Sequence, residues 1–285
     1  MNDYIIITDS TSDLPEYLVK ELGIKVMPMK YIIDGDNYCD EKVMPITDFY
    51  KMMRNKKRLT TSSINVATFI EEFENQVKNG KDVIYISLSS GISGNYSAAK
   101  IAAQEIMERH KGSKVFAVDS LCASLGEGLL VYYAAEKKKE GLSIESLRDW
   151  LDANKLNVCH WFTVDDLFHL KRGGRISSAS ATIGAMLGMK PIVRASKDGK
   201  LELSEKVRGK KAALMALVNK VESMIDFSKG KEVFISHADA LDDATFVAKL
   251  LKERLNIKNI LINYIGPTMG AHSGPGAVAL FFMGK

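Results

Sequence analysis

The sequence has few cysteines and shows no metal-binding spacing. Only three cysteines occur among 285 residues, at Cys39, Cys122 and Cys159, and no two of them form a CxxC pair. Because a disulfide framework or a zinc site needs closely grouped cysteines, neither is expected. The five histidines are scattered without an HExxH motif, so we expect no metal and no cofactor. A reducing cytoplasm is the simplest location.

Long apolar runs and a targeting segment are also missing. No stretch reaches the roughly 20 apolar residues that a membrane helix needs. The start, Met1 to Tyr4, carries an acid where a signal peptide would carry bases. We therefore expect a protein with no stable membrane insertion.

An excess of charge of one sign is equally absent. Lys and Arg total 39 and Asp and Glu total 35, which gives a formal net charge of +4. This excess is too small to indicate a nucleic-acid partner. The sequence contains neither a P-loop motif nor the GxSxG turn, so the usual signatures of nucleoside triphosphate binding and of α/β-hydrolases are missing.

The patterning that is present indicates an α/β protein. Hydrophobic residues make up 46% of the chain and charged residues 26%, which is typical of a folded protein with a sizeable core. Short apolar runs alternate with amphipathic stretches of helical period, which predicts βαβ units and a largely parallel sheet. Asp13 is expected to cap the first helix and Gly23 to end it, and Asp-Gly pairs at 34–35 and 198–199 predict tight hairpins. Strands are expected at 4–8, 24–27, 83–88, 115–118, 159–163, 233–236 and 260–265, and helices at 47–55, 66–78, 95–109, 125–139, 143–154, 209–224 and 242–255.

The texture of the sequence changes after the helix expected at 143–154. No Pro-rich or Ser-rich linker marks the change, and no internal repeat occurs. A chain of this length folds as one large or two medium domains. We predict two α/β domains, 1–155 and 156–285.

Hydroxyl and carboxylate side chains follow three of the expected strands. They occur at 8–13, 89–94 and 119–120, and a further hydroxyl cluster, Thr60 to Ser63, precedes a helix. Ligands bind beyond the carboxyl ends of strands in doubly wound sheets, and hydroxyls with backbone N–H groups at helix starts hold oxyanions. The alternative for any single residue is that it caps a helix. Repetition at adjacent strand ends favours an anion site.

Two basic segments and one glycine-rich segment stand out. The segments 171–175 and 206–211 are either solvated surface or sites for an anion or a partner, and arginine is the better anion ligand because its planar fork grips oxyanions. The segment 266–276 holds four glycines and two prolines around His272 and is expected to form a rigid loop. Near neutral pH His272 is expected to hydrogen-bond or protonate an anionic group.

Taken together, these segments resemble the DegV family, bacterial fatty-acid-binding proteins that include the acyl-carrying subunits of fatty acid kinase. No single motif is decisive, but the ordered set covers essentially the whole chain. The matching segments are 9–15, 61–62, 88–94, 118–120, 162–175, 190–192 and 266–276.

The resemblance implies an N-terminal α/β domain with a mostly parallel, Rossmann-like sheet and a C-terminal α/β domain with a mixed sheet. One long-chain fatty acid, such as palmitate, is then enclosed in a tunnel between the domains, with its carboxylate held by hydroxyls. By the motif match, Thr61 and Ser93 fall at the carboxylate-binding positions, with Ser62 beside Thr61. Arg208 and His272 fall near the head group.

One departure from the family pattern concerns the head-group shell. The family commonly continues the Thr-Ser pair as Gln-Pro-Ser, where this chain has 63–65 as Ser-Ile-Asn. A buried carboxylate needs several donors, and an acyl tail needs an apolar slot. Among 13 methionines, Met186 and Met189 are expected in a helix of small residues, where flexible side chains line such a slot.

Three functions remain as hypotheses. The first is a lipid-binding protein rather than an enzyme, which transports a fatty acid or presents it to a separate fatty acid kinase, with Arg172 at the docking surface. The second is a serine acyl hydrolase with Ser93 as nucleophile and His272 as base. The third and weakest is a DNA-binding regulator, which the modest charge disfavours.

Overall fold

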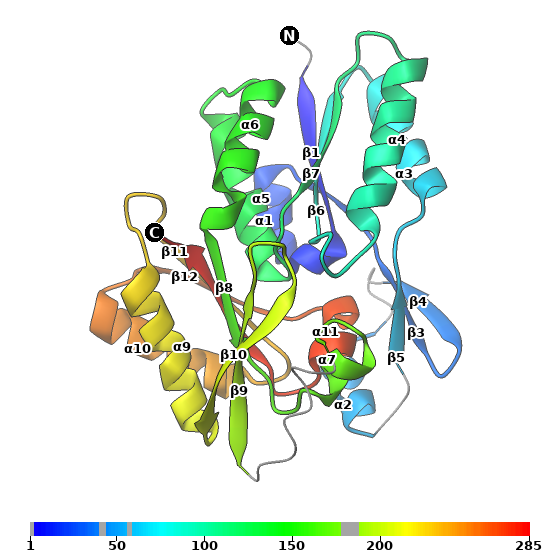
Figure 1. Cartoon of the computed structure of the whole chain (residues 1–285). Coiled ribbons are helices and arrows are strands. Elements are labelled where there is room, and N and C mark those ends of the chain that lie inside the picture. The colour runs from blue at the N-terminus through cyan, green and yellow to red at the C-terminus, as the bar shows by residue number, and fades with distance from the viewer. Residues whose placement is uncertain (1–2, 40–43, 56–58, 178–187) are drawn as a thin grey trace.

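A parallel four-stranded sheet forms one half of the protein (Figure 1). This computed structural model describes residues 3–39, 44–55, 59–177 and 188–285. The strand order is β2-β1-β6-β7, and every neighbouring pair is parallel. The strands are β1 (Tyr4–Asp9), β2 (Lys25–Met27), β6 (Asp82–Ser87) and β7 (Val115–Asp119).

Helices cover both faces of this sheet (Figure 1). On one face, Phe69 and Phe73 of α3 pack with Tyr85 of β6 in a core that α4 completes. On the other face lie α5 and α6, so both faces of the parallel sheet are buried, as such sheets require. The helices of this half are α1 (Glu16–Leu22), α3 (Val66–Lys78), α4 (Asn95–Arg109), α5 (Leu125–Lys139) and α6 (Ile144–Asn154), with the 3-10 turns η1 (Ser10–Ser12) and η2 (Lys155–Asn157).

A mixed six-stranded sheet forms the other half, in the order β10-β9-β8-β13-β11-β12. Only β11 and β12 pair in parallel, and the other neighbours are antiparallel. The elements are β8 (Val158–Thr163), β9 (Met189–Ala195), β10 (Leu201–Arg208), α9 (Lys210–Met224), β11 (Glu232–His237), α10 (Leu241–Leu255), β12 (Asn259–Tyr264) and β13 (Val278–Met283).

Alternation along β13 shows how this sheet is covered. Leu280 and Phe282 belong to the core that α9 and α10 complete, whereas Ala279 and Phe281 belong to the core that contains α5. Because successive side chains of a strand point to opposite faces, α5 and the pair α9–α10 lie on opposite sides of the sheet.

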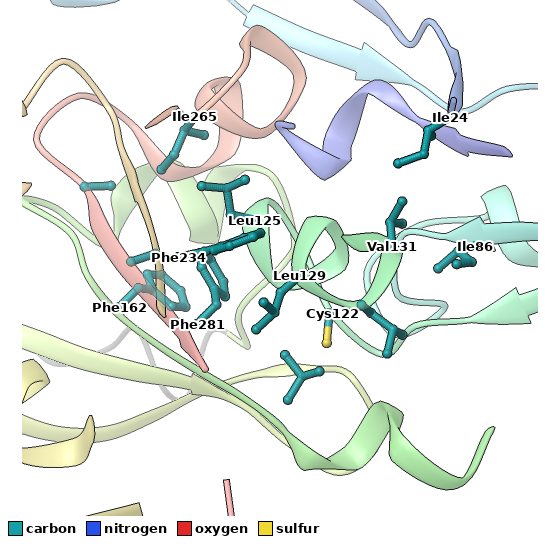
Figure 2. Close-up of a cluster of buried hydrophobic side chains, with 14 of the residues drawn as sticks. Ile24, Ile86, Cys122, Leu125, Leu129, Val131, Phe162, Phe234, Ile265 and Phe281 are labelled. Carbon is teal, nitrogen blue, oxygen red and sulfur yellow. The ribbon is translucent and has the colours of Figure 1, made fainter. Parts of the chain in front are cut away.

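Helix α5 therefore lies between the two sheets. It contacts β1 and β6 of the parallel sheet and β8, β11 and β13 of the mixed one. In Figure 2, Leu125 and Leu129 lie toward Phe281, whereas Val131 lies toward Ile86 of the parallel sheet. A Cβ on Gly126 would stand 2.7 Å from the Phe281 ring, so glycine permits the close approach of helix and sheet.

A third, antiparallel sheet in the order β4-β3-β5 carries the hydroxyl cluster. It places Thr61 opposite Tyr31. No helix of the described segments is long and apolar enough to cross a bilayer. The remaining elements are β3 (Lys30–Ile33), β4 (Asp36–Cys39), α2 (Ile46–Arg54), β5 (Leu59–Ser62), α7 (Phe168–Arg172) and α11 (Pro267–Ser273).

The α/β class with a parallel and a mixed sheet is confirmed, while several local predictions are wrong. Asp13 caps no α-helix: it is left-handed at φ 52° and follows η1, and α1 begins only after Pro15. The segment expected as a rigid loop forms α11, because Pro267 at the first helical position is preset for a helix.

Two further predictions concern the second half. Met189 begins strand β9 instead of lying in a helix, and Met186 lies outside the described residues. All strands of the parallel sheet precede residue 155 and all strands of the mixed sheet follow it. The domain boundary at 155 stays a prediction.

Candidate functional site

A mostly apolar cavity lies where the two sheets and the small antiparallel sheet meet. It encloses about 780 Å³, its open mouth included. Its apolar lining includes Leu88, Ile92, Phe162, Leu170, Ile265 and Phe281, and its polar lining includes Thr61, Ser63, Ser93, His160, Arg175 and His272.

A hydrogen bond between Thr61 and His272 marks the polar end of the cavity. Thr61 Oγ1 lies 2.8 Å from His272 Nε2, although the first residue is on β5 and the second on α11. Helix α11 is held in place because the Tyr50 hydroxyl donates to the Ile265 carbonyl at 2.7 Å and packs closely on Gly270, whose Cβ would stand 2.6 Å from that hydroxyl.

The His272 ring is neutral at physiological pH. Burial, with a smaller contribution from the charges of Arg175 and Arg172, lowers its pKa to about 4. Its Nδ1 is buried without a hydrogen-bond partner among the described residues. Of the two roles expected for His272, hydrogen bonding to an anion stays a prediction, whereas protonating one near neutral pH is disfavoured, because the neutral ring is not the imidazolium that would give up a proton.

Arg175 supplies a positive charge at the same end of the cavity. Its Nε donates to the Ile92 carbonyl at 3.2 Å, and its Nη1 donates to the Gly173 carbonyl. Burial lowers its pKa. No carboxylate of the described segments forms an ion pair with it, so the charge is free to meet an anionic ligand.

Of the predicted hydroxyls, Ser93 lines the cavity and Ser62 does not. Ser93 Oγ accepts a hydrogen bond from Asn95 N at 3.3 Å. Ser62 and Ser63 are both exposed, but only Ser63 lines the cavity together with Thr61. Alternation along β5 and the residue after it explains this, because residues two apart point to the same side. Asn65 caps α3 by accepting from Thr68 N at 2.9 Å.

The two predicted surface arginines lie outside the cavity lining. Arg208 is exposed at the end of β10, where it pairs with Met189 of β9. Arg172 is exposed on α7, with its guanidinium 5.6 Å from the centre of the Phe168 ring. The roles assigned to both residues stay predictions. Sequence reasoning singled out the segment that holds Arg175 but did not assign Arg175 itself to the site.

The polar residues at the end of β1 and directly after it form a buried network and do not line the cavity. Asp9 accepts hydrogen bonds from Tyr85 Oη at 2.6 Å and from Asn95 Nδ2 at 3.0 Å. Glu127 of α5 contacts the hydroxyls of Thr8 and Thr11 at 2.7 and 2.9 Å. Burial, together with the nearby Asp9 charge, raises the pKa of Glu127 well above its usual range. These groups hold α5 against the sheet.

The geometry gives no support to a hydrolase. A serine nucleophile needs a base within hydrogen-bond reach, but His272 pairs with Thr61, and no histidine of the described segments is hydrogen-bonded to Ser93. Those segments also hold no group of three or more metal-ligating side chains.

Comparison with known proteins identifies the family. The model of the family described as "Uncharacterised protein, DegV family" matches residues 4–285. A DegV domain-containing protein of Clostridium perfringens is 41% identical over 286 residues, which cover 100% of this chain and 98% of that protein.

Solved structures of the family share the fold. A fatty-acid-binding DegV family protein from Thermus thermophilus has a TM-score of 0.88 and 29% identity, with 100% of both chains covered. DegV of Bacillus subtilis, a fatty acid binding protein, has a TM-score of 0.86 and 29% identity, again with 100% of both chains covered. With its whole length matched in sequence and in structure, this chain belongs to the DegV family.

Proposed function

We propose that the cavity binds one long-chain fatty acid, such as palmitate, with its carboxylate at Thr61 and its acyl tail along β8 and β13. The observation that carries the proposal is the Thr61–His272 hydrogen bond at one end of a cavity whose walls are otherwise mainly apolar. The binding of fatty acids by the related proteins of T. thermophilus and B. subtilis supports it.

The head-group end offers the donors that a buried carboxylate requires. If His272 Nε2 carries the ring proton, it donates to Thr61 Oγ1, and the Thr61 hydroxyl is free to donate to the carboxylate. The Ser93 hydroxyl lines the same cavity, and the unpaired Arg175 charge balances the anion. Such pairing is needed because a bare carboxylate is very costly to bury.

The test is direct. Native mass spectrometry of the protein purified from cells is expected to show a bound fatty acid, and the delipidated protein is expected to gain the mass of one palmitate when that acid is added. A protein that stays at its apo mass in palmitate contradicts the proposal.

We further infer that the protein transports the acid or presents its carboxylate to a separate fatty acid kinase. The support is positional: α7 contacts α11, which carries His272, and exposes Phe168 and Arg172 on its surface. The free state of all three cysteines supports a cytoplasmic setting for this exchange. Phosphorylation of the bound acid by a kinase fraction, reduced in Arg172→Ala with palmitate affinity unchanged, is the expected result.

A further inference from the structure

His160 is a polar residue in the apolar part of the cavity, and its ring has no hydrogen-bond partner. It lies on β8, is only 7% exposed, and its Nδ1 is fully buried. Its ring centre lies 4.6 Å from that of Phe281 and 5.5 Å from that of Phe162. Within the described residues, neither ring nitrogen forms a hydrogen bond, whereas Thr61, Ser93 and Ser124 of the same cavity all do.

The ring is neutral, and its buried Nδ1 has no hydrogen-bond partner among the described residues. Burial lowers the pKa of His160 to about 3, so the imidazole carries one N–H donor and one acceptor nitrogen at physiological pH. Leaving a buried polar group without a hydrogen bond is unfavourable, because the group has lost its contact with water. An alkyl chain has no donor or acceptor that could form a hydrogen bond with either nitrogen.

Strand register places His160 far from the head group. Ala277, Ala279 and Phe281 line the cavity in turn, and Phe281 is paired with His160 in the sheet. Since β13 begins just after α11, the residue nearest His272 along this row is Ala277. At about 3.3 Å per residue the row from 277 to 281 extends about 13 Å.

His160 also lines a second hollow. It is lined by His160 together with Leu121, Lys155, Arg194 and Lys197, and it encloses about 550 Å³, its open side included. His160 thus lines both the acyl cavity and this second hollow, whose lining mixes cationic with apolar side chains, so a bound chain that reaches this part of the cavity meets a hydrogen-bonding ring.

We propose that the cavity accepts acyl chains with a hydrogen-bonding oxygen, such as a hydroxyl group, at the end remote from the carboxylate, and that His160 is the residue that recognises this oxygen. The inference rests on the proposed fatty acid binding and adds a class of ligand to it. A hydroxyl can donate to one nitrogen of a neutral imidazole or accept from the other, so either tautomer of His160 serves.

The test compares palmitate with ω-hydroxypalmitate on the delipidated full chain. In the wild type, ω-hydroxypalmitate is expected to bind at least as tightly as palmitate. In His160→Phe, which keeps a ring of similar shape without nitrogens, the affinity for ω-hydroxypalmitate relative to palmitate is expected to fall about tenfold or more. Thr61→Ala is the matched control, because it is expected to weaken both acids by the same factor and to leave their ratio unchanged.

The outcomes separate this inference from the proposed function. Failure of the wild type to bind either acid overturns fatty acid binding itself. If the wild type binds palmitate but His160→Phe leaves the ratio of the two affinities unchanged, the role of His160 is overturned. A water molecule then provides the hydrogen bond for the ring. If the variant does not fold, ¹⁵N NMR of the wild-type histidines decides: a His160 ring nitrogen is expected to shift with ω-hydroxypalmitate and not with palmitate, and equal spectra contradict the proposal.

Discussion

The imidazole Nε2 of His272 lies 2.8 Å from the hydroxyl oxygen of Thr61, although 211 positions separate the two residues. The bond joins β5, at the edge of the small antiparallel sheet, to α11, which connects β12 and β13 of the mixed sheet. Because the neutral ring can fix the direction of the Thr61 hydroxyl, the pair can supply the donor that the proposed fatty-acid carboxylate requires. The site therefore depends on how two distant parts of the chain pack.

Replacement of Thr61 tests this donor. Thr61→Ala is expected to weaken palmitate binding by about 1–3 kcal/mol, which is roughly 5-fold to 150-fold in Kd, because the carboxylate loses a hydrogen bond in a buried site. Thr61→Ser keeps the hydroxyl and is expected to stay within about threefold of the wild type. Titration calorimetry on delipidated protein measures both variants, and equal affinities for the wild type and Thr61→Ala would remove Thr61 from the site.

The protonation state of His272 makes a separate prediction. Since burial lowers its pKa to about 4, the ring stays neutral from about pH 6 to about pH 8, and palmitate affinity is expected to be nearly constant over that range. A ring that had to be protonated would instead bind more weakly as the pH rises through its usual value of about 6.5. The slope of log Kd against pH decides between the two.

Much of the fold could be predicted from the sequence because its helices carry strong local signals. The predicted ranges 66–78, 95–109 and 125–139 coincide with α3, α4 and α5. Each has a clear apolar period or a long run of helix-favouring residues. The hairpin at Asp34-Gly35 is also confirmed, with both residues at positive φ.

What the sequence did not reveal depends on tertiary contacts. The sequence of β13 is a continuous apolar run. It shows no alternation of apolar and polar residues, because both faces of the strand are buried. The His160 ring has no hydrogen-bond partner among the described residues because aromatic side chains are packed around it. Arg175 lines the cavity because of the path of the turn after α7, where Gly173 packs against His272.

Acid stability is expected to depend on His160. Its pKa in the folded protein is about 3, below the usual 6.5, so the unfolded chain takes up a proton first and the free energy of unfolding falls as the pH drops below about 6.5. At a pH about 1.5 units lower the loss from this residue is about 2 kcal/mol. In urea unfolding, the free energy of unfolding of His160→Phe is expected to fall less steeply between about pH 7 and 5 than that of the wild type. The same dependence on pH in both proteins would contradict a buried neutral ring.

Glu127 is expected to act in the opposite direction. Its pKa is raised in the folded protein, so its contribution to stability is complete below the unfolded value of about 4.5 and is lost as the pH rises through the folded value. Glu127→Gln removes this loss, because an amide can face the Thr8 and Thr11 hydroxyls without a charge. The variant is expected to gain stability relative to the wild type as the pH is raised.

The control for Glu127 lies on the same helix. Glu136 is partly exposed and pairs with Lys139, so Glu136→Gln is expected to leave the pH dependence of unfolding close to that of the wild type. Urea unfolding across a series of pH values compares the variants. The same slope for Glu127→Gln and the wild type would mean that Glu127 is charged in the folded protein.

The two arginines proposed around the head group are expected to differ in their effects. Arg175 lines the cavity without an ion-pair partner in the described segments, whereas Arg208 is exposed and absent from the lining. A charge close to a buried carboxylate attracts it far more strongly than a solvated one does. Arg175→Ala is therefore expected to weaken palmitate binding about tenfold or more, and Arg208→Ala less than threefold. Arg175→Lys keeps the charge but loses the planar guanidinium, and its loss of palmitate affinity is expected to lie between these two values. If Arg208→Ala has the larger effect, the head group lies nearer the end of β10 than the cavity indicates.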